Sequence, residues 1–136
     1  MARRLSNDPC RVTFADKVSG SAITFSYRMP TTSERAGYEN GLWTKDEKTG
    51  EVKDNVRATR RKYGLEILTG IGDGDFEDAA GQPISSDPAA EHYREDWSEL
   101  VAQYAGDLLE LLAIHAFEPN VRGVANTDPF PGTSKR

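Results

Sequence analysis

Large apolar side chains recur every three or four residues between positions 97 and 115, a periodicity typical of an amphipathic helix. One broad face carries Trp97, Leu100, Val101, Tyr104, Leu108, Leu111, Leu112 and His115. The opposite face is mainly polar, with Glu99, Gln103, Asp107 and Glu110. Asp87 and Pro88 suit an N-cap and a first helical residue, and the Glu118–Pro119 step disfavours continued helix. We therefore predict one helix from about residue 88 to 117, whose apolar face must be covered by another layer.

Two segments near the N-terminus alternate apolar and polar residues, which is the pattern of half-buried β-strands. They span residues 10–15 and 22–28, and residues 16–20 between them have the composition of a turn. The alternating apolar positions are Cys10, Val12 and Phe14, then Ile23, Phe25 and Tyr27. An isolated hairpin is only marginally stable in water. We therefore predict an antiparallel hairpin whose apolar face packs on helices or on another chain.

The middle of the chain is predicted to contain two shorter helices. Thr31 and Glu34 have the spacing of a capping box, which predicts a helix over residues 32–42. The charged residues 44–53 are expected to form an exposed loop, followed by a helix over 52–69 with Gly70 as its left-handed cap. Residues 70–90 hold four glycines and two prolines and form the longest predicted loop.

With 136 residues, the chain has the length of a single domain. The predicted fold class is α+β, an N-terminal β-hairpin packed against about three helices, with polar N- and C-terminal tails. We divide the chain into an N-terminal arm (1–9), a single α+β domain (10–117) and an extended C-terminal tail (118–136).

Charge and composition exclude several classes of protein. The formal charge of −5 and pI near 5.1 make nucleic acid an unlikely partner, since nucleic-acid-binding domains are usually basic. No apolar run approaches the 18 residues of a membrane span, so no membrane partner is expected. The N-terminus has positive charge without an apolar stretch behind it, so we expect no secretion by a signal peptide. The single cysteine excludes an internal disulfide framework and fits a reducing compartment.

Enzymatic motifs are missing from the sequence as well. There is no Gly-x-Ser-x-Gly nucleophile elbow, and no spacing singles out a pair of carboxylates for acid–base catalysis. The glycines of residues 70–74 follow a predicted helix rather than a strand, so they do not form a phosphate-binding loop. We predict a protein without catalytic residues and without a cofactor.

An ion-binding module is one alternative function. Asp73, Asp75 and Glu77 place carboxylates at alternate positions, as calcium loops do. An EF-hand counted from Asp73 requires Gly where Asp78 stands and Glu where Ile84 stands. The other interpretation is a solvated acidic loop that Phe76 and Ile84 pin to the domain.

Three arginines and three aromatic residues are candidate partner contacts. Arg57, Arg60 and Arg61 form a cationic cluster that can grip phosphates or a partner's carboxylates, or be an ordinary solvated helix face. A small nucleic-acid-associated regulator is the corresponding alternative function. Aromatic anchors are enriched in protein interfaces, and we single out Phe76, Trp97 and Phe130.

Three segments carry a resemblance: Phe25-Ser-Tyr-Arg-Met-Pro-Thr-Thr-Ser-Glu-Arg35, Arg60-Arg-Lys-Tyr-Gly-Leu-Glu-Ile-Leu-Thr-Gly70, and Asp96-Trp-Ser-Glu-Leu100 through Leu112. Together they resemble small tail-module proteins of long-tailed and Mu-like bacteriophages, either tail-assembly-chaperone-like or virion structural proteins. The resemblance implies a non-enzymatic protein that binds other phage structural proteins during tail or virion assembly. It also implies a homo- or hetero-oligomer found in the virion or in the bacterial host cytoplasm during assembly. It assigns no functional residue.

Overall fold

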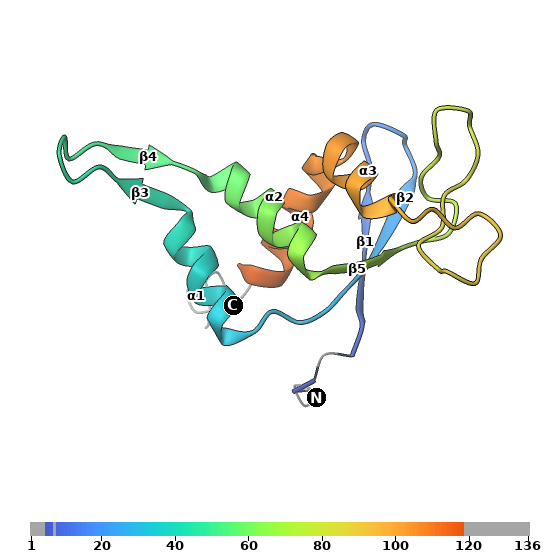
Figure 1. Cartoon of the computed structure of the whole chain (residues 1–136), viewed down its shortest axis with the longest axis horizontal. Helices are drawn as coiled ribbons and strands as arrows, with labels where there is room; N and C mark the ends of the chain where they lie inside the picture. Colours follow the sequence, from blue (N-terminus) through green and yellow to red (C-terminus); the bar gives the residue numbers. More distant parts are fainter. Residues whose placement is uncertain (1–4, 7, 119–136) are drawn as a thin grey trace, which may run out of the picture.

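The computed structural model describes residues 5–6 and 8–118 and has an α+β fold (Figure 1). β1 (Cys10–Ala15) and β2 (Ala22–Tyr27) form an antiparallel hairpin in which Cys10 is opposite Tyr27 and Ala15 opposite Ala22. This confirms the predicted hairpin. β5 (Leu68–Ile71) pairs with the other edge of β2, so the strand order is β1-β2-β5.

The prediction of a left-handed cap at Gly70 is wrong, because Gly70 lies within β5 opposite Ser26. The preceding helix α2 (Val56–Ile67) ends earlier, where Leu68 turns to extended backbone. β5 has only four residues, which is too short for an alternation of apolar and polar residues to be recognised in the sequence.

Helix α1 (Thr32–Gly41) begins with the predicted capping box. Thr31 Oγ1 accepts a hydrogen bond from the Glu34 amide at 3.1 Å, and Glu34 Oε1 accepts one from the Thr31 amide at 3.0 Å. Both groups are therefore satisfied at the helix N-terminus, where such amides lack helical partners.

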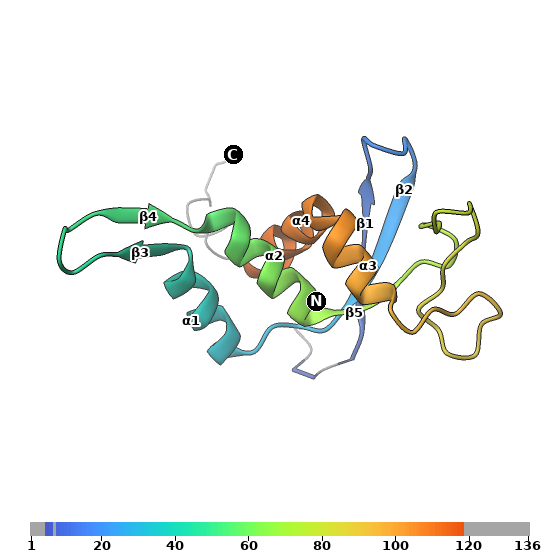
Figure 2. The same ribbon diagram turned by 45° about the horizontal axis from the view of Figure 1, so that its top comes forward.

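The expected loop over residues 44–53 is instead a second hairpin, formed by β3 (Trp43–Lys45) and β4 (Val52–Asp54). The Asp46 carboxylate accepts the amide of Lys48, and Gly50 takes a φ of +73° that closes the turn. β4 occupies residues 52–54, the first positions of the helix predicted over 52–69, and α2 begins only at Val56. Figures 1 and 2 both show it extending away from the helices and the sheet.

The prediction of a single helix over 88–117 is wrong. The segment instead contains two helices, α3 (Trp97–Tyr104) and α4 (Gly106–Phe117), and the chain bends by 96° between them. The break is at Ala105, whose amide donates to the Val101 carbonyl at 2.8 Å and whose own carbonyl accepts the Leu108 amide at 3.0 Å. Ala105 thus ends one helix and starts the next. Asp87 does not start a helix. Its carboxylate accepts a hydrogen bond from the Ala89 amide within a turn.

α4 packs closely against α2, and its His115 ring contacts the Phe14 and Tyr27 rings of the sheet. Leu109 and Leu112 of α4 are fully buried in the core. The most completely buried large side chains are Ile23, Phe25, Tyr38, Ile67, Leu109 and Leu112. Glu118, the C-cap of α4, is tied to α2, since its carboxylate accepts hydrogen bonds from Arg60. Within the described residues no single helix has the length and hydropathy of a membrane span. α3 and α4 meet that criterion only together, across their bend.

We expect the stability of the domain to fall in acid through one ion pair. Both terminal nitrogens of Arg28 donate to Glu34, at 2.7 and 2.6 Å, and this hydrogen bonding lowers the pKa of Glu34 from 4.5 to about 2. Because the pKa is lowered in the folded state, the stabilisation is present above about pH 4.5 and is lost as the pH falls towards 2.

Glu34→Gln should therefore lower the free energy of unfolding by about 1–2 kcal/mol at pH 7. The difference from the wild type should shrink as the pH falls below about 4.5. Urea unfolding followed by circular dichroism from pH 7 to pH 3 measures this. A difference that does not change with pH contradicts the assignment.

Candidate functional site

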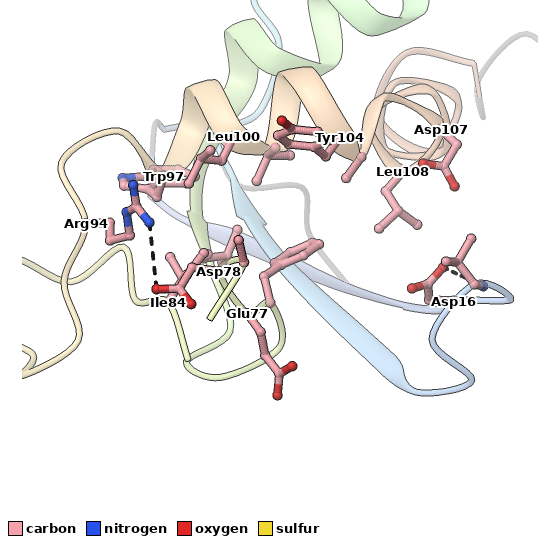
Figure 3. Close-up of a pocket in the computed structure, with 16 residues that line it drawn as sticks. Asp16, Glu77, Asp78, Ile84, Arg94, Trp97, Leu100, Tyr104, Asp107 and Leu108 are labelled. Atoms are coloured by element: carbon pink, nitrogen blue, oxygen red, sulfur yellow. Dashed lines mark hydrogen bonds and ion pairs between the residues drawn. The ribbon is translucent and has the colours of Figure 1, made fainter. Parts of the chain in front are cut away.

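A cleft of about 660 Å³ lies between the β1–β2 turn, the segment around residues 76–84 and the junction of α3 with α4 (Figure 3). Its apolar lining is Val18, Ile71, Phe76, Ala79, Ile84, Trp97, Leu100, Val101, Tyr104, Ala105 and Leu108. Clefts of this size and character bind ligands or partner segments, with a few polar groups fixing the orientation. The cleft is therefore the candidate functional site.

The bend at Ala105 creates this cleft. Because the chain turns by 96° there, Leu100 and Tyr104 of α3 and Leu108 of α4 line the same cleft (Figure 3). In one continuous helix, the residues on either side of position 105 would extend along a single line. The apolar face recognised in residues 97–115 is thus divided between two environments: some of its side chains pack in the core, and others line the cleft.

The wall opposite α3 is an irregular segment fixed by hydrogen bonds. The Ile84 amide donates to the Phe76 carbonyl at 2.9 Å, and Asp78 Oδ1 accepts the amides of Ala80 and Gln82. Ser85 is 2% exposed and donates its hydroxyl to Asp73 Oδ1 at 2.6 Å. The predicted long loop is therefore well anchored, and it continues to the start of α3.

The rim of the cleft is acidic. Asp16, Glu77, Asp78 and Asp107 contribute four carboxylates against the one guanidinium of Arg94, a formal charge of 1 − 4 = −3. Arg94 lies 3.8 Å from Asp78. Within the described part of the chain, the Glu77 and Asp107 carboxylates make no hydrogen bond or ion pair, so both are available to a cationic partner.

Asp16 is held in place by its own turn. Its carboxylate accepts the Ser19 hydroxyl at 2.7 Å and the Val18 amide at 3.1 Å, and these hydrogen bonds lower the pKa of Asp16. The carboxylate therefore stays ionised at neutral pH and contributes to the negative potential at the rim.

The three candidate metal ligands, Asp73, Asp75 and Glu77, have different surroundings and do not converge on one point. Asp73 accepts from Ser85, and Asp75 Oδ2 accepts the Thr24 amide at 2.8 Å, which ties the segment to β2. Glu77 stands on the cleft rim. Among residues 5–6 and 8–118, no group of three or more His, Cys, Asp or Glu side chains is placed to hold a metal ion. This arrangement gives no support to the ion-binding alternative.

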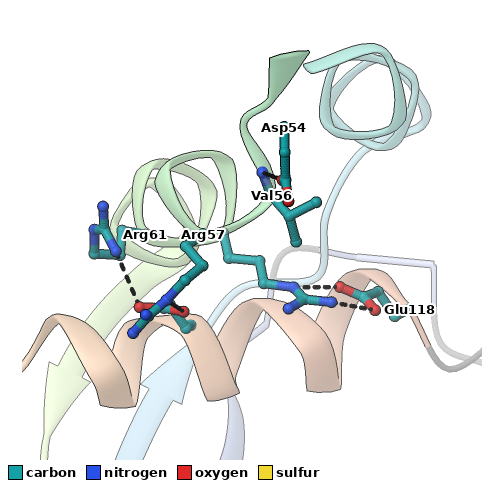
Figure 4. Close-up of polar contacts among 7 residues, drawn as sticks. Asp54, Val56, Arg57, Arg61 and Glu118 are labelled. Carbon is teal, nitrogen blue, oxygen red and sulfur yellow. Dashed lines mark hydrogen bonds and ion pairs between the residues drawn. The ribbon is translucent and has the colours of Figure 1, made fainter. Parts of the chain in front are cut away.

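The three candidate arginines pair with α4 inside the chain (Figure 4). Arg57 and Arg61 each donate to Glu110 at 3.1 Å, and Arg60 donates to both carboxylate oxygens of Glu118 at 2.9 and 3.1 Å. Glu110, assigned to the polar face, thus turns towards α2. The cluster joins two helices and does not form an unpaired basic stripe, so it gives no support to the nucleic-acid alternative.

Two of the three candidate aromatic anchors lie together. Phe76 and Trp97 both line the cleft, and Phe76 also stacks on Phe25 with ring centroids 6.1 Å apart. Phe130 lies outside the described residues.

The sequence interpretation did not single out Asp16, Val18 or Asp107 as candidate contacts, although all three line the cleft. Val18 and Tyr104 are 88% and 77% exposed, although both are large and apolar or aromatic. Gly106, directly after a run of helical residues, was the signal that could have revealed the bend.

The β3–β4 hairpin is a second exposed apolar surface. The pairing places Trp43 opposite Asp54 and Lys45 opposite Val52, so these four side chains share one face. Trp43 is 55% exposed and Val52 61%. An exposed tryptophan on a two-stranded ribbon is typical of a contact made with another molecule.

Comparison with known proteins found no matching family model, no curated protein with significant similarity and no similar solved structure.

Proposed function

We propose that this protein is a non-enzymatic structural or assembly component of a bacteriophage, acting through protein–protein contacts in tail or virion assembly. The observation that carries the proposal is the cleft, in which an apolar lining with three aromatic residues is surrounded by an acidic rim. Interfaces between proteins combine an apolar, aromatic-rich centre with a polar border in this way.

The exposed hairpin adds to the case for a contact protein. Its Trp43 face and the cleft lie at different ends of the molecule (Figures 1 and 3), so one copy has two separate surfaces for neighbours. A chain with two such surfaces can join more than one partner. The phage setting, in the virion or in the bacterial host cytoplasm, comes from the sequence resemblance.

The test is to co-express the full chain with the products of the genes next to its own and to measure complexes by native mass spectrometry. We expect a complex with at least one capsid or tail protein. Val18→Lys with Tyr104→Lys adds two cations to the exposed border of the cleft, and Trp43→Ser with Val52→Ser removes the apolar face of the hairpin. At least one of these double variants should weaken the complex by 10-fold or more.

Lys48→Ala, in the hairpin turn and away from the paired face, is the matched control and should leave the complex unchanged. The proposal fails if no neighbouring product binds, or if both double variants bind as well as the wild type.

A further inference from the structure

The cleft has a combination of features that restricts what it can bind. Its aromatic lining is Phe76, Trp97 and Tyr104, and the unpaired carboxylates of Glu77 and Asp107 lie on its rim. Grooves lined by aromatic side chains bind proline-rich segments, whose extended conformation is already favoured before binding. The acidic rim favours a segment that also carries positive charge.

The chain itself contains such a segment. Residues 128–136 read Asp-Pro-Phe-Pro-Gly-Thr-Ser-Lys-Arg, which places one aromatic ring between two prolines and two cations a few residues later. Over residues 119–136 there are three basic and one acidic residue, a charge of 3 − 1 = +2. The rest of the chain then has −5 − 2 = −7, so the segment and the body attract each other.

The segment separates its aromatic ring from its cations. Lys135 is five positions after Phe130, which corresponds to about 15 Å in extended polyproline geometry. This length lets the Phe130 ring and the two cations occupy different parts of the cleft, the ring at the apolar lining and the cations at the rim. Figure 3 shows Asp107 next to Leu108 and Glu77 on the segment that faces the helices.

α4 places the start of this segment away from the cleft. Leu108, in the first turn of α4, lines the cleft, whereas Glu118 at the other end is held by Arg60 and Tyr38 (Figure 4). Ten residues of helix correspond to about 15 Å. Each copy thus carries its cleft and the root of its segment at separate places, which suits contact between copies in a head-to-tail order.

We infer that the cleft binds residues 128–136 of a second copy of this chain, with Phe130 in the apolar lining and Lys135 and Arg136 at the acidic rim. This inference rests on the proposed function, because it names the partner of the same cleft. Occupation by the chain's own segment is the alternative that the experiment must separate.

The experiment uses two full-length variants with complementary defects. Phe130→Ala has an intact cleft and a defective segment, whereas Val18→Lys with Tyr104→Lys has an intact segment and a defective cleft. Sedimentation velocity over a range of concentrations should show self-association of the wild type that weakens with added salt. Each variant alone should associate at least 10-fold more weakly. Val124→Ala, four positions before the proposed binding segment, is the control and should associate like the wild type.

Mixing the two variants should restore association, but only to a 1:1 dimer, because the mixture has one intact cleft for each intact segment. The inference is overturned if Phe130→Ala associates like the wild type, if the mixture forms no dimer, or if the wild type stays monomeric throughout. A wild type that stays monomeric but still binds neighbouring gene products would overturn this inference and leave the proposed function standing.

Discussion

Gly64→Ala should destabilise the protein by about 2–3 kcal/mol, although alanine normally stabilises a helix relative to glycine. Gly64 is buried in α2, where it faces α4. A Cβ added there would lie 2.3 Å from the Leu109 carbonyl oxygen and 3.0 Å from its carbon. Both atoms belong to the backbone of α4, so the helices must separate to relieve the overlap. Urea unfolding measures the loss.

Gly37→Ala in α1 is the matched control. A Cβ there would meet the tip of the Tyr63 side chain, at 2.5 Å from its hydroxyl oxygen, and not a backbone atom. The side chain can shift, and alanine gains helix propensity, so we expect a change within about 1 kcal/mol. Equal effects at the two positions would contradict the close packing of α2 on α4.

Glu118→Ala should lower the free energy of unfolding by about 2–3 kcal/mol. The carboxylate accepts both hydrogen bonds of Arg60 and the hydroxyl of Tyr38, so it joins α1 and α2 to the end of α4. Arg60 is 24% exposed at its side chain, and Tyr38 as a whole is 1% exposed. Removal of the acceptor leaves a buried hydroxyl and a largely buried cation without this partner.

Glu110→Ala provides the comparison on the same helix. Glu110 also binds two arginines, but Arg57 and Arg61 are 75% and 44% exposed, so water replaces the lost contact. The expected loss is about 1 kcal/mol or less. Adding Tyr38→Phe to Glu118→Ala should recover part of the larger loss, because the buried hydroxyl that has lost its carboxylate acceptor is then removed. If Glu118→Ala and Glu110→Ala lower the free energy of unfolding equally, the burial of the arginine and tyrosine partners does not determine the size of the effect.

Much of the fold could be predicted because its signals are local. Alternation in residues 10–15 and 22–27 identified the first hairpin, and the capping box at Thr31 identified the start of α1. The elements that escaped prediction are three or four residues long, as in β3, β4 and β5. Strands this short are defined by their partners, which a linear pattern does not specify.

The site was predicted only in part, since its shape depends on the bend at Ala105. The apolar periodicity of 97–115 continues through the bend, so the pattern alone indicates one helix. Phe76 and Trp97 were singled out separately as candidate partner contacts, and the pattern did not indicate that they line one cleft. Arg57, Arg60 and Arg61 were singled out for their charge, whereas their carboxylate partners lie about 50 residues away on α4. Contacts over such a distance follow from tertiary packing.

The most direct measurement replaces Tyr104, on the cleft border, with a photo-crosslinking amino acid in the full chain. Chains labelled with ¹⁴N and ¹⁵N are mixed and irradiated, and the crosslinked peptides are identified by mass spectrometry. We predict that residue 104 of one isotope crosslinks to the peptide containing Phe130 of the other. Two results would contradict binding of a second copy in the cleft: crosslinks between residue 104 and this peptide that join only peptides of the same isotope, and no crosslink to this peptide at all.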